Sequence, residues 1–278
     1  TARSMSVLPA AATGTHQVCV RAWVADTAAG RAAAAALREE LQRYAALAAG
    51  GTDLRAIGPL EVRSIADADW RTRWRADFPV VRVGRIVIRP PWLEAEAQEH
   101  DVVVTVDPGQ AFGTGLHPTT QLALHGLSHW AEAGTLQDLS AHGAGLLDVG
   151  TGSGILLIAA LRLGARRATG VDIDELAVAA ATENLARNGL ADRATIRLGS
   201  LPVAEGATPL VVANLVATLQ VELAAQLAAA VAPGGRLLSS GLLAARAPDA
   251  IAALASRGLT LVRTWDDGDW SAAEFART

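Results

Sequence analysis

Residues 146–154 have the sequence LLDVGTGSG, and the nine residues after them, ILLIAALRL, are almost entirely apolar. An apolar strand, a glycine-bearing turn and an apolar helix form the first half of a βαβ unit, and the new helix presents free N–H groups at its start. Gly150 permits the tight turn, Gly152 allows the backbone to approach a ligand, and Gly154 allows helix and strand to pack closely. This stretch therefore predicts a ligand-binding loop in an α/β sheet.

From residue 101 onward the chain continues this alternation of strands and helices. Further apolar runs predict strands at 102–106, 168–171, 195–198, 210–213 and 236–240. Helical patterns cover 121–133, 175–187, 218–231 and 248–257. Residues 259–265 and 270–276 predict a final antiparallel hairpin. Alternating strands and helices form parallel βαβ units, so the predicted fold class is α/β with a doubly wound sheet.

A shorter α/β segment precedes this domain. Alternating apolar residues predict a strand at 16–24, good helix formers predict a helix at 28–47, and PLEVRSI predicts a second strand at 59–65. We therefore expect a small N-terminal α/β domain over residues 1–69.

The segment 70–100 is expected to be a linker between this small domain and the main domain, which covers 101–278. Within the linker, residues 80–89 predict a short hairpin or strand pair, which the two prolines at 90 and 91 end.

The spacing of the glycines and two carboxylates indicate which ligand the loop binds. A dinucleotide-binding loop has the pattern G-x-G-x-x-G, whereas this loop has G-x-G-x-G and carries Asp148 at the end of its strand. A carboxylate there suits a cationic ligand, and S-adenosylmethionine carries an ammonium and a sulfonium group. Asp172 ends the next strand, where a carboxylate reaches ribose hydroxyls. The alternative is that Asp172 caps the next helix, but Asp174 can do that, so the pattern favours S-adenosylmethionine over nicotinamide dinucleotides and flavins.

Asn214 follows the strand predicted at 210–213, one βαβ step beyond the cofactor strands. This position lies at the crevice where open α/β sheets bind ligands. The side-chain carbonyl of Asn214 can accept an N–H from an amine, so we expect Asn214 to be catalytic, with the backbone carbonyl of Leu215 beside it. The alternative is that Asn214 is a turn residue at a strand end.

Composition limits the class of function. The chain has 278 residues, 51% of them hydrophobic, which is enough for a sizeable core. Its net charge of −4 provides no basic field to bind nucleic acid by its phosphates. Cys19 is the only cysteine, which fits a reducing cytosol, and neither a signal-peptide pattern nor a membrane-spanning run is visible. We therefore expect a cytoplasmic monomer with no membrane or direct nucleic-acid partner.

Four motifs together carry a resemblance to a known family. They are DPGQAFGTGLHPTT at 107–120, LLDVGTGSGILLIAAL at 146–161, GVDIDELAV at 170–178 and VVANLVA at 211–217. Because it carries these motifs in this order, the chain from about Asp69 onward resembles the PrmA family, the methyltransferases of ribosomal large-subunit protein eleven. The first motif is the specific one, since a generic methyltransferase lacks it.

The resemblance implies a Rossmann-like, S-adenosylmethionine-dependent methyltransferase domain with a mostly parallel seven-stranded sheet. The implied reaction is N-methylation of lysine side chains and an N-terminal amine of the ribosomal protein, which the N-terminal domain, reduced or divergent here, would recognise. The cofactor contacts carried over are Thr120, Gly150, Asp172 and Asn214, with Phe112, Gly113 and Thr114 over the reactive end. Asp148 and Gly152 from the glycine loop complete the expected cofactor-binding residues.

Other interpretations concern single residues and the whole chain. His117 is either a general base or a residue that bonds to backbone at a helix start. The histidines have no metal-ligand spacing, so no metal is expected. A serine hydrolase is excluded because its Gly-x-Ser-x-Gly motif needs a glycine two residues before and two residues after the serine, whereas Ser153 has Thr151 and Ile155 at these positions.

Three alternative functions remain for the whole chain. They are a methyltransferase that acts on another protein or a small molecule, a non-catalytic S-adenosylmethionine-binding module, and a nicotinamide dehydrogenase, which the glycine spacing disfavours.

Overall fold

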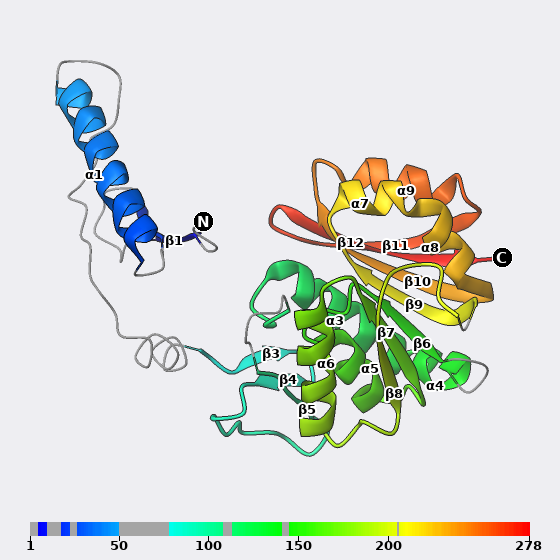
Figure 1. Ribbon diagram of the computed structural model, residues 1–278. Coiled ribbons are helices and arrows are strands. Elements are labelled where there is room, and N and C mark those ends of the chain that lie inside the picture. Colours follow the sequence, from blue (N-terminus) through cyan, green and yellow to red (C-terminus); the bar gives the residue numbers. More distant parts are fainter. Residues whose placement is uncertain are drawn as a thin grey trace. The chain divides into compact units, whose positions relative to one another are not determined.

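The computed structural model of the protein describes residues 5–9, 18–22, 27–49, 78–107, 113–140, 145–204 and 206–278 (Figure 1). The chain divides into two compact units, Thr1–Asp77 and Phe78–Thr278. None of the helices in these described ranges is long and apolar enough to cross a membrane.

The first unit contains two strands and one long helix. Strand β1, Met5–Pro9, pairs antiparallel with β2, Val18–Ala22, and helix α1 covers Ala28–Ala49. The strand predicted at 16–24 and the helix predicted after it are confirmed as β2 and α1. Strand β1 was not predicted, and the strand predicted at 59–65 lies outside the described residues.

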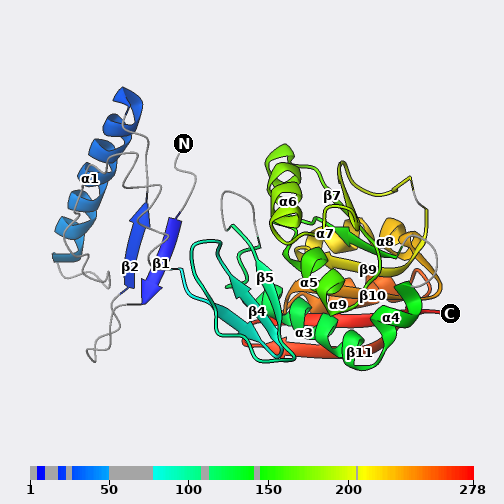
Figure 2. The same ribbon diagram turned by 90° about the horizontal axis from the view of Figure 1, so that it is seen from below.

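The second unit begins with a three-stranded sheet. Strand β3, Val81–Val83, pairs antiparallel with β4, Ile86–Arg89, and β4 pairs parallel with β5, Val102–Thr105. Figure 2 shows β4 and β5 apart from the strands of the larger sheet. The predicted hairpin and the predicted strand after it are confirmed. Part of the segment expected as a linker therefore belongs to this unit, while the functional division at 69/70 and 100/101 stays a prediction.

A seven-stranded sheet forms the centre of the second unit. Its strands are β6 Leu146–Val149, β7 Ala168–Asp172, β8 Ala194–Leu198, β9 Thr208–Asn214, β10 Val231–Leu243, β11 Leu259–Asp267 and β12 Trp270–Arg277. They lie in the order β11-β12-β10-β9-β6-β7-β8. The pairings from β10 to β8 are parallel, whereas β12 is antiparallel to both of its neighbours. The expected mostly parallel, doubly wound sheet is confirmed.

The last strand of the sheet is not at its edge. Strand β12 lies between β10 and β11, with Phe275 opposite Leu237 on one side and opposite Leu261 on the other. Phe275 and Leu237 are completely buried, whereas Leu261 on the edge strand is 41% exposed. The final hairpin therefore contributes an internal strand, and its first arm, β11, forms the edge.

Helices cover both faces of this sheet. They are α3 Pro118–Glu132, α4 Thr135–Ser140, α5 Ile155–Leu163, α6 Glu175–Arg187, α7 Ala217–Glu222, α8 Ala224–Ala230 and α9 Ala247–Ala255. In Figure 1, α3, α5 and α6 lie on one side of the sheet and α7, α8 and α9 on the other. Each side has its own hydrophobic core, as a doubly wound sheet requires.

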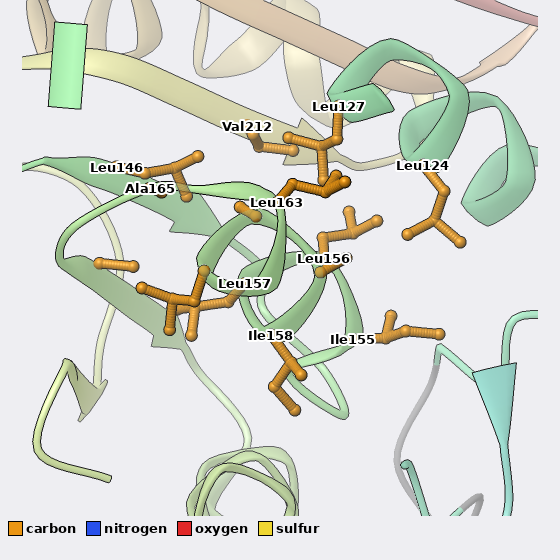
Figure 3. Close-up of a cluster of buried hydrophobic side chains, with 14 of the residues drawn as sticks. Leu124, Leu127, Leu146, Ile155, Leu156, Leu157, Ile158, Leu163, Ala165 and Val212 are labelled. Atoms are coloured by element: carbon orange, nitrogen blue, oxygen red, sulfur yellow. The ribbon is translucent and has the colours of Figure 1, made fainter. Parts of the chain in front are cut away.

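Helix α5 follows the glycine loop and is apolar nearly all round because it is buried. Figure 3 shows Leu124 and Leu127 of α3, Leu146 of β6 and Val212 of β9 arranged around it. The predicted bounds of this helix, and those of α6, are confirmed. The single helix predicted at 218–231 is wrong, because the chain bends at Leu223, which ends α7 and begins α8.

Candidate active site

Two of the predicted site residues, Asp172 and Asn214, lie at the carboxyl edge of the seven-stranded sheet. Val149 of β6 is opposite Val171 of β7 and opposite Ala213 of β9. The residues that follow these three positions therefore lie side by side, and they include Asp172 and Asn214. The chain leaves β6 toward β7 on one side and returns as β9 on the other, which is the crevice where such sheets bind ligands.

The glycine loop is tied to β7 and packed by Leu215. The N–H groups of Gly150 and Thr151 donate to the carbonyl of Val171 at 2.9 and 3.0 Å. Gly150 has a φ of +73°, and a Cβ at this position would lie 2.6 Å from Cδ2 of Leu215. The loop thus needs glycine both for its backbone conformation and for its contact with a residue predicted to be catalytic.

We expect Gly150→Ala to weaken cofactor binding by moving Leu215 and the loop apart. Gly189→Ala is the matched control, because Gly189 also has a positive φ, +65°, with no atom near its added Cβ within 4 Å. The control should lose about 1 kcal/mol of unfolding free energy from backbone strain and keep its cofactor affinity. Denaturant unfolding and calorimetric titration with S-adenosylmethionine separate the two effects. Equal affinities in both variants would contradict this interpretation.

Asp172 is half-buried, and its carboxylate is fixed in place. Its Oδ2 accepts the N–H of Gly152 at 2.9 Å, and its Oδ1 accepts the N–H of Asp174 at 3.1 Å. Asp174 caps α6 by accepting the N–H of Leu176 at 2.9 Å, as the sequence suggested. Asp172 therefore does not have to cap the helix, and each of its oxygens keeps a lone pair for a hydroxyl donor.

Two apolar side chains beside Asp172 were not selected from the sequence. Ile173 is 79% exposed, and Leu198, opposite Asp172 in the sheet, is 55% exposed. Apolar side chains next to a carboxylate that is predicted to bind ribose suit the flat face of a base. In the sequence, Ile173 and Leu198 look like ordinary surface residues. Their position beside Asp172 becomes visible only in the fold.

The surroundings of Asp148 show whether a cationic ligand would fit at the glycine loop. It is 1% exposed, and its Oδ2 accepts the hydroxyl of Thr151 at 2.7 Å. Its Oδ1 is buried with no hydrogen-bond partner among the described residues. The pKa of Asp148 is raised to about 7, mainly by burial and to a smaller extent by the negative charge of Asp172, while the hydrogen bond from Thr151 lowers it. A buried carboxylate with one unsatisfied oxygen at this loop fits the ammonium group of S-adenosylmethionine.

The raised pKa of Asp148 predicts how the stability of the ligand-free protein depends on pH. A carboxyl group with a higher pKa in the folded than in the unfolded state contributes stability below about pH 4, and this contribution disappears as the pH rises through about 7. A pKa difference of this size corresponds to about 4 kcal/mol. We expect the unfolding free energy to fall between about pH 4 and about pH 7, and to fall less in Asp148→Asn. Denaturant titrations of both proteins test this, and parallel pH profiles would refute it.

Asn214 and its neighbours form the other half of the site. The amide nitrogen of Asn214 points to the hydroxyl of Thr120, which is 1% exposed, at a long 3.5 Å. A Cβ on Gly241 would lie 3.0 Å from Oδ1 of Asn214 and 2.4 Å from the carbonyl oxygen of Leu215. The two predicted acceptors for an amine are therefore close together, and only a glycine at position 241 allows the backbone to pack this close to them.

A buried glutamine that the sequence did not indicate holds this half of the site. Gln220 is completely buried, and its Nε2 donates to the carbonyls of Leu215 at 2.8 Å and Ser240 at 2.7 Å. Its Oε1 accepts the hydroxyl of Ser239 at 2.5 Å. The Leu215 carbonyl thus already has one donor, and a second lone pair is left for a substrate.

The second glycine-bearing stretch, which precedes α3, is joined to the first. The hydroxyl of Ser153 donates to the carbonyl of Gly113 at 2.6 Å. Thr114 follows, half-buried, and Phe112 lies outside the described residues. His117 caps α3, since its Nδ1 accepts the N–H of Thr119 at 3.3 Å, which favours its structural interpretation.

No group of three or more His, Cys, Asp or Glu that could hold a metal ion occurs in the part of the chain that the structure describes. The site is instead built from a glycine loop, two carboxylates and an amide. This loop, the acidic end of β7 and the sheet with one reversed strand define the class of Rossmann-like, S-adenosylmethionine-dependent methyltransferases.

Comparison with known proteins gives the particular family. A family model described as ribosomal protein L11 methyltransferase (PrmA) matches residues 9–278, and the chain belongs to this family. The chain is 41% identical over 250 residues to the ribosomal protein L11 methyltransferase of Chloroflexus aurantiacus, covering 81% of this chain and 74% of the relative. It is 45% identical over 218 residues to that of Geobacter metallireducens, covering 78% and 69%.

A solved structure agrees with this assignment. The crystal structure of ribosomal protein L11 methylase from Lactobacillus delbrueckii subsp. bulgaricus matches with a TM-score of 0.63 and 31% identity. The match covers 71% of this chain and 98% of that chain. The resemblance inferred from the four motifs is therefore confirmed at the level of the family and the fold.

Proposed function

We propose that this chain transfers methyl groups from S-adenosylmethionine to amines of ribosomal protein L11, namely lysine side chains and an N-terminal amine. The observation that carries the proposal is the pair of acceptors beside Gly241. Oδ1 of Asn214 and the carbonyl of Leu215 lie close together, next to the glycine loop, in a chain that belongs to this family. Amine N–H groups need such acceptors, whereas a hydroxyl or carbon nucleophile does not need two.

We assign cofactor binding to two groups of residues. Asp148, Gly150, Gly152 and Asp172 would hold the amino-acid and ribose parts, and Gly113, Thr114, Thr120 and Asn214 the region near the reactive end. Phe112 belongs to the second group as a prediction from the sequence. Support comes from the unsatisfied oxygen of Asp148 and from the hydrogen bond that joins the two loops.

The cofactor supplies a methyl group already activated on a positively charged sulfur, so strong acid–base groups are not required. The protein must position a neutral amine, although the reference pKa of a lysine amine is about 10.4. Two carbonyl acceptors orient the remaining N–H groups of the amine, and the buried setting of Thr120 and Gly241 keeps water away from them. Asn214 and Leu215 are therefore the proposed catalytic residues.

The deciding experiment is incubation with labelled S-adenosylmethionine and either ribosomal subunits or isolated ribosomal protein L11, followed by mass spectrometry. This chain contains no lysine, since all of its basic side chains are arginine or histidine. Methyl-lysine in the product therefore comes from the substrate and not from the enzyme. Label on L11 supports the proposal, and label on another protein or a metabolite supports the alternative substrates. Binding of the cofactor without any transfer would support a non-catalytic module.

We further propose that the protein acts as a monomer in the cytoplasm, where ribosomal proteins are assembled, and that residues 1–69 recognise the substrate. Light scattering of the purified protein tests the oligomeric state. Removal of residues 1–69 should leave cofactor binding intact and abolish methylation of L11, which a titration and the labelling assay would show.

A further inference from the structure

Asn184 of α6 connects two distant parts of the chain at the cofactor site. It is completely buried, although its side chain is polar. Its Nδ2 donates to the carbonyl of Ser153 in the glycine loop at 2.9 Å, and its Oδ1 accepts the N–H of Asp107 at 3.0 Å. One side chain therefore bridges the glycine loop and the start of the second glycine-bearing stretch.

Ser153 provides a second connection between the same two regions. Its hydroxyl donates to the carbonyl of Gly113 at 2.6 Å, and a Cβ on Gly113 would lie 2.8 Å from that hydroxyl oxygen. Asp107 is therefore linked to Ser153 through Asn184, and Gly113 is linked to it directly. Both positions are fixed relative to the glycine loop.

The contacts of Asn184 require a primary amide. Oδ1 also accepts a hydrogen bond from Nη1 of Arg187 at 3.0 Å, and Nη2 of Arg187 is 3.6 Å from Oδ2 of Asp107. A donor toward a carbonyl and an acceptor toward an N–H can come only from an amide at this length. An ionised aspartate offers acceptors alone, and leucine offers neither.

We propose that Asn184 is a positioning residue for the cofactor site. It holds the glycine loop in one arrangement with Asp107 directly and with Gly113 through Ser153, so that both sets of residues meet S-adenosylmethionine. This inference rests on the proposed function. Asn184 acts through Ser153 and Asp107 and has no assigned contact with the cofactor or the substrate.

Asn188, which forms the C-cap of α6 four residues after Asn184, offers a matched control. It is 6% exposed, its Oδ1 accepts the N–H of Thr105 at 3.0 Å, and its Nδ2 donates to the carbonyl of Thr105 at 2.7 Å. These bonds attach α6 to β5 and do not reach the glycine loop. Loss of Asn188 should therefore reduce stability in the same way as loss of Asn184, without changing the relation between the two loops.

The test compares Asn184→Ala, Asn188→Ala and Ser153→Ala with the wild-type protein. Calorimetric titration gives the Kd for S-adenosylmethionine, and thermal unfolding gives Tm. We expect both asparagine variants to have a lower Tm, but only Asn184→Ala to raise the Kd, by about tenfold. Ser153→Ala should also raise the Kd, because it removes the link to Gly113. In steady-state assays, Asn184→Ala should raise KM for the cofactor more than it lowers kcat.

The possible results distinguish failure of this inference from failure of the proposed function. If the wild-type protein does not bind S-adenosylmethionine, the proposed function fails. If the wild-type protein binds and Asn184→Ala binds equally well, or if Asn188→Ala loses as much affinity, only the positioning role fails. Should Asn184→Ala not fold, Asn184→Asp replaces it, because it keeps the acceptor for Asp107 and loses the donor for Ser153. An unchanged Kd in Asn184→Asp and Ser153→Ala would then overturn the inference.

Discussion

Asn214→Ala should lower kcat for methyl transfer by about 100-fold, the size of effect expected when a reacting group loses its orientation. The variant removes Oδ1, one of the two acceptors beside Gly241, and leaves the Leu215 carbonyl held by Gln220. Cofactor binding should weaken by less than tenfold, since the glycine loop and Asp172 stay in place. Single-turnover assays with saturating S-adenosylmethionine and L11 measure the loss directly.

Thr120→Val is the companion variant for this prediction. The hydroxyl of Thr120 is the contact of the Asn214 amide nitrogen at 3.5 Å, and valine has nearly the same shape. We expect a smaller loss of kcat, because Asn214 keeps Oδ1 but loses a weak restraint. Normal turnover by Asn214→Ala would remove Asn214 from the mechanism.

Asp172→Ala should weaken the binding of S-adenosylmethionine by about 100-fold. Two hydrogen bonds to a charged acceptor contribute about 3 kcal/mol together, which corresponds to this factor. The substitution also leaves the N–H of Gly152 without its acceptor, so the glycine loop becomes less well ordered. Calorimetric titration of the wild-type protein and the variant measures the difference in Kd.

Asp174→Ala is the control for Asp172→Ala, since it removes a carboxylate two residues away. Asp174 caps α6 through the N–H of Leu176, so its loss should lower the unfolding free energy by about 1 kcal/mol. Its affinity for the cofactor should not change. If both variants bind equally well, or if Asp172→Ala keeps wild-type affinity, the ribose-binding role of Asp172 is wrong.

Most of the second unit could be predicted from the sequence because its signals are local. The apolar run of β6, the glycine loop and the apolar helix α5 follow one another directly, and Asp174 marks the start of α6 as an N-cap. The break at Leu223 between α7 and α8 could not be predicted, since no glycine or proline marks it. Strand β1 was missed because its short segment becomes a strand only by pairing with β2.

Candidate site residues could be predicted from the sequence where the position of a residue at the end of a strand is visible in a motif. Asp172 and Asn214 end strands, and strand ends of parallel sheets meet at one edge. Asn184 and Gln220 had no such signal, because each is a polar residue in a helix whose partners lie elsewhere in the sequence. Their roles depend on packing between elements, which a helical pattern does not reveal.

The place of β12 within the sheet has a consequence for the synthesis of the protein. Translation produces β10 long before residues 270–277, so the edge of β10 stays unpaired while the intervening residues emerge. An interrupted or truncated polypeptide would expose that edge and the apolar surface that Phe275 covers, and such species aggregate readily. The core of the second unit is therefore complete only when β12 is in place, so loss of a few residues from β12 should be far more damaging than loss of residues from the edge strand β11.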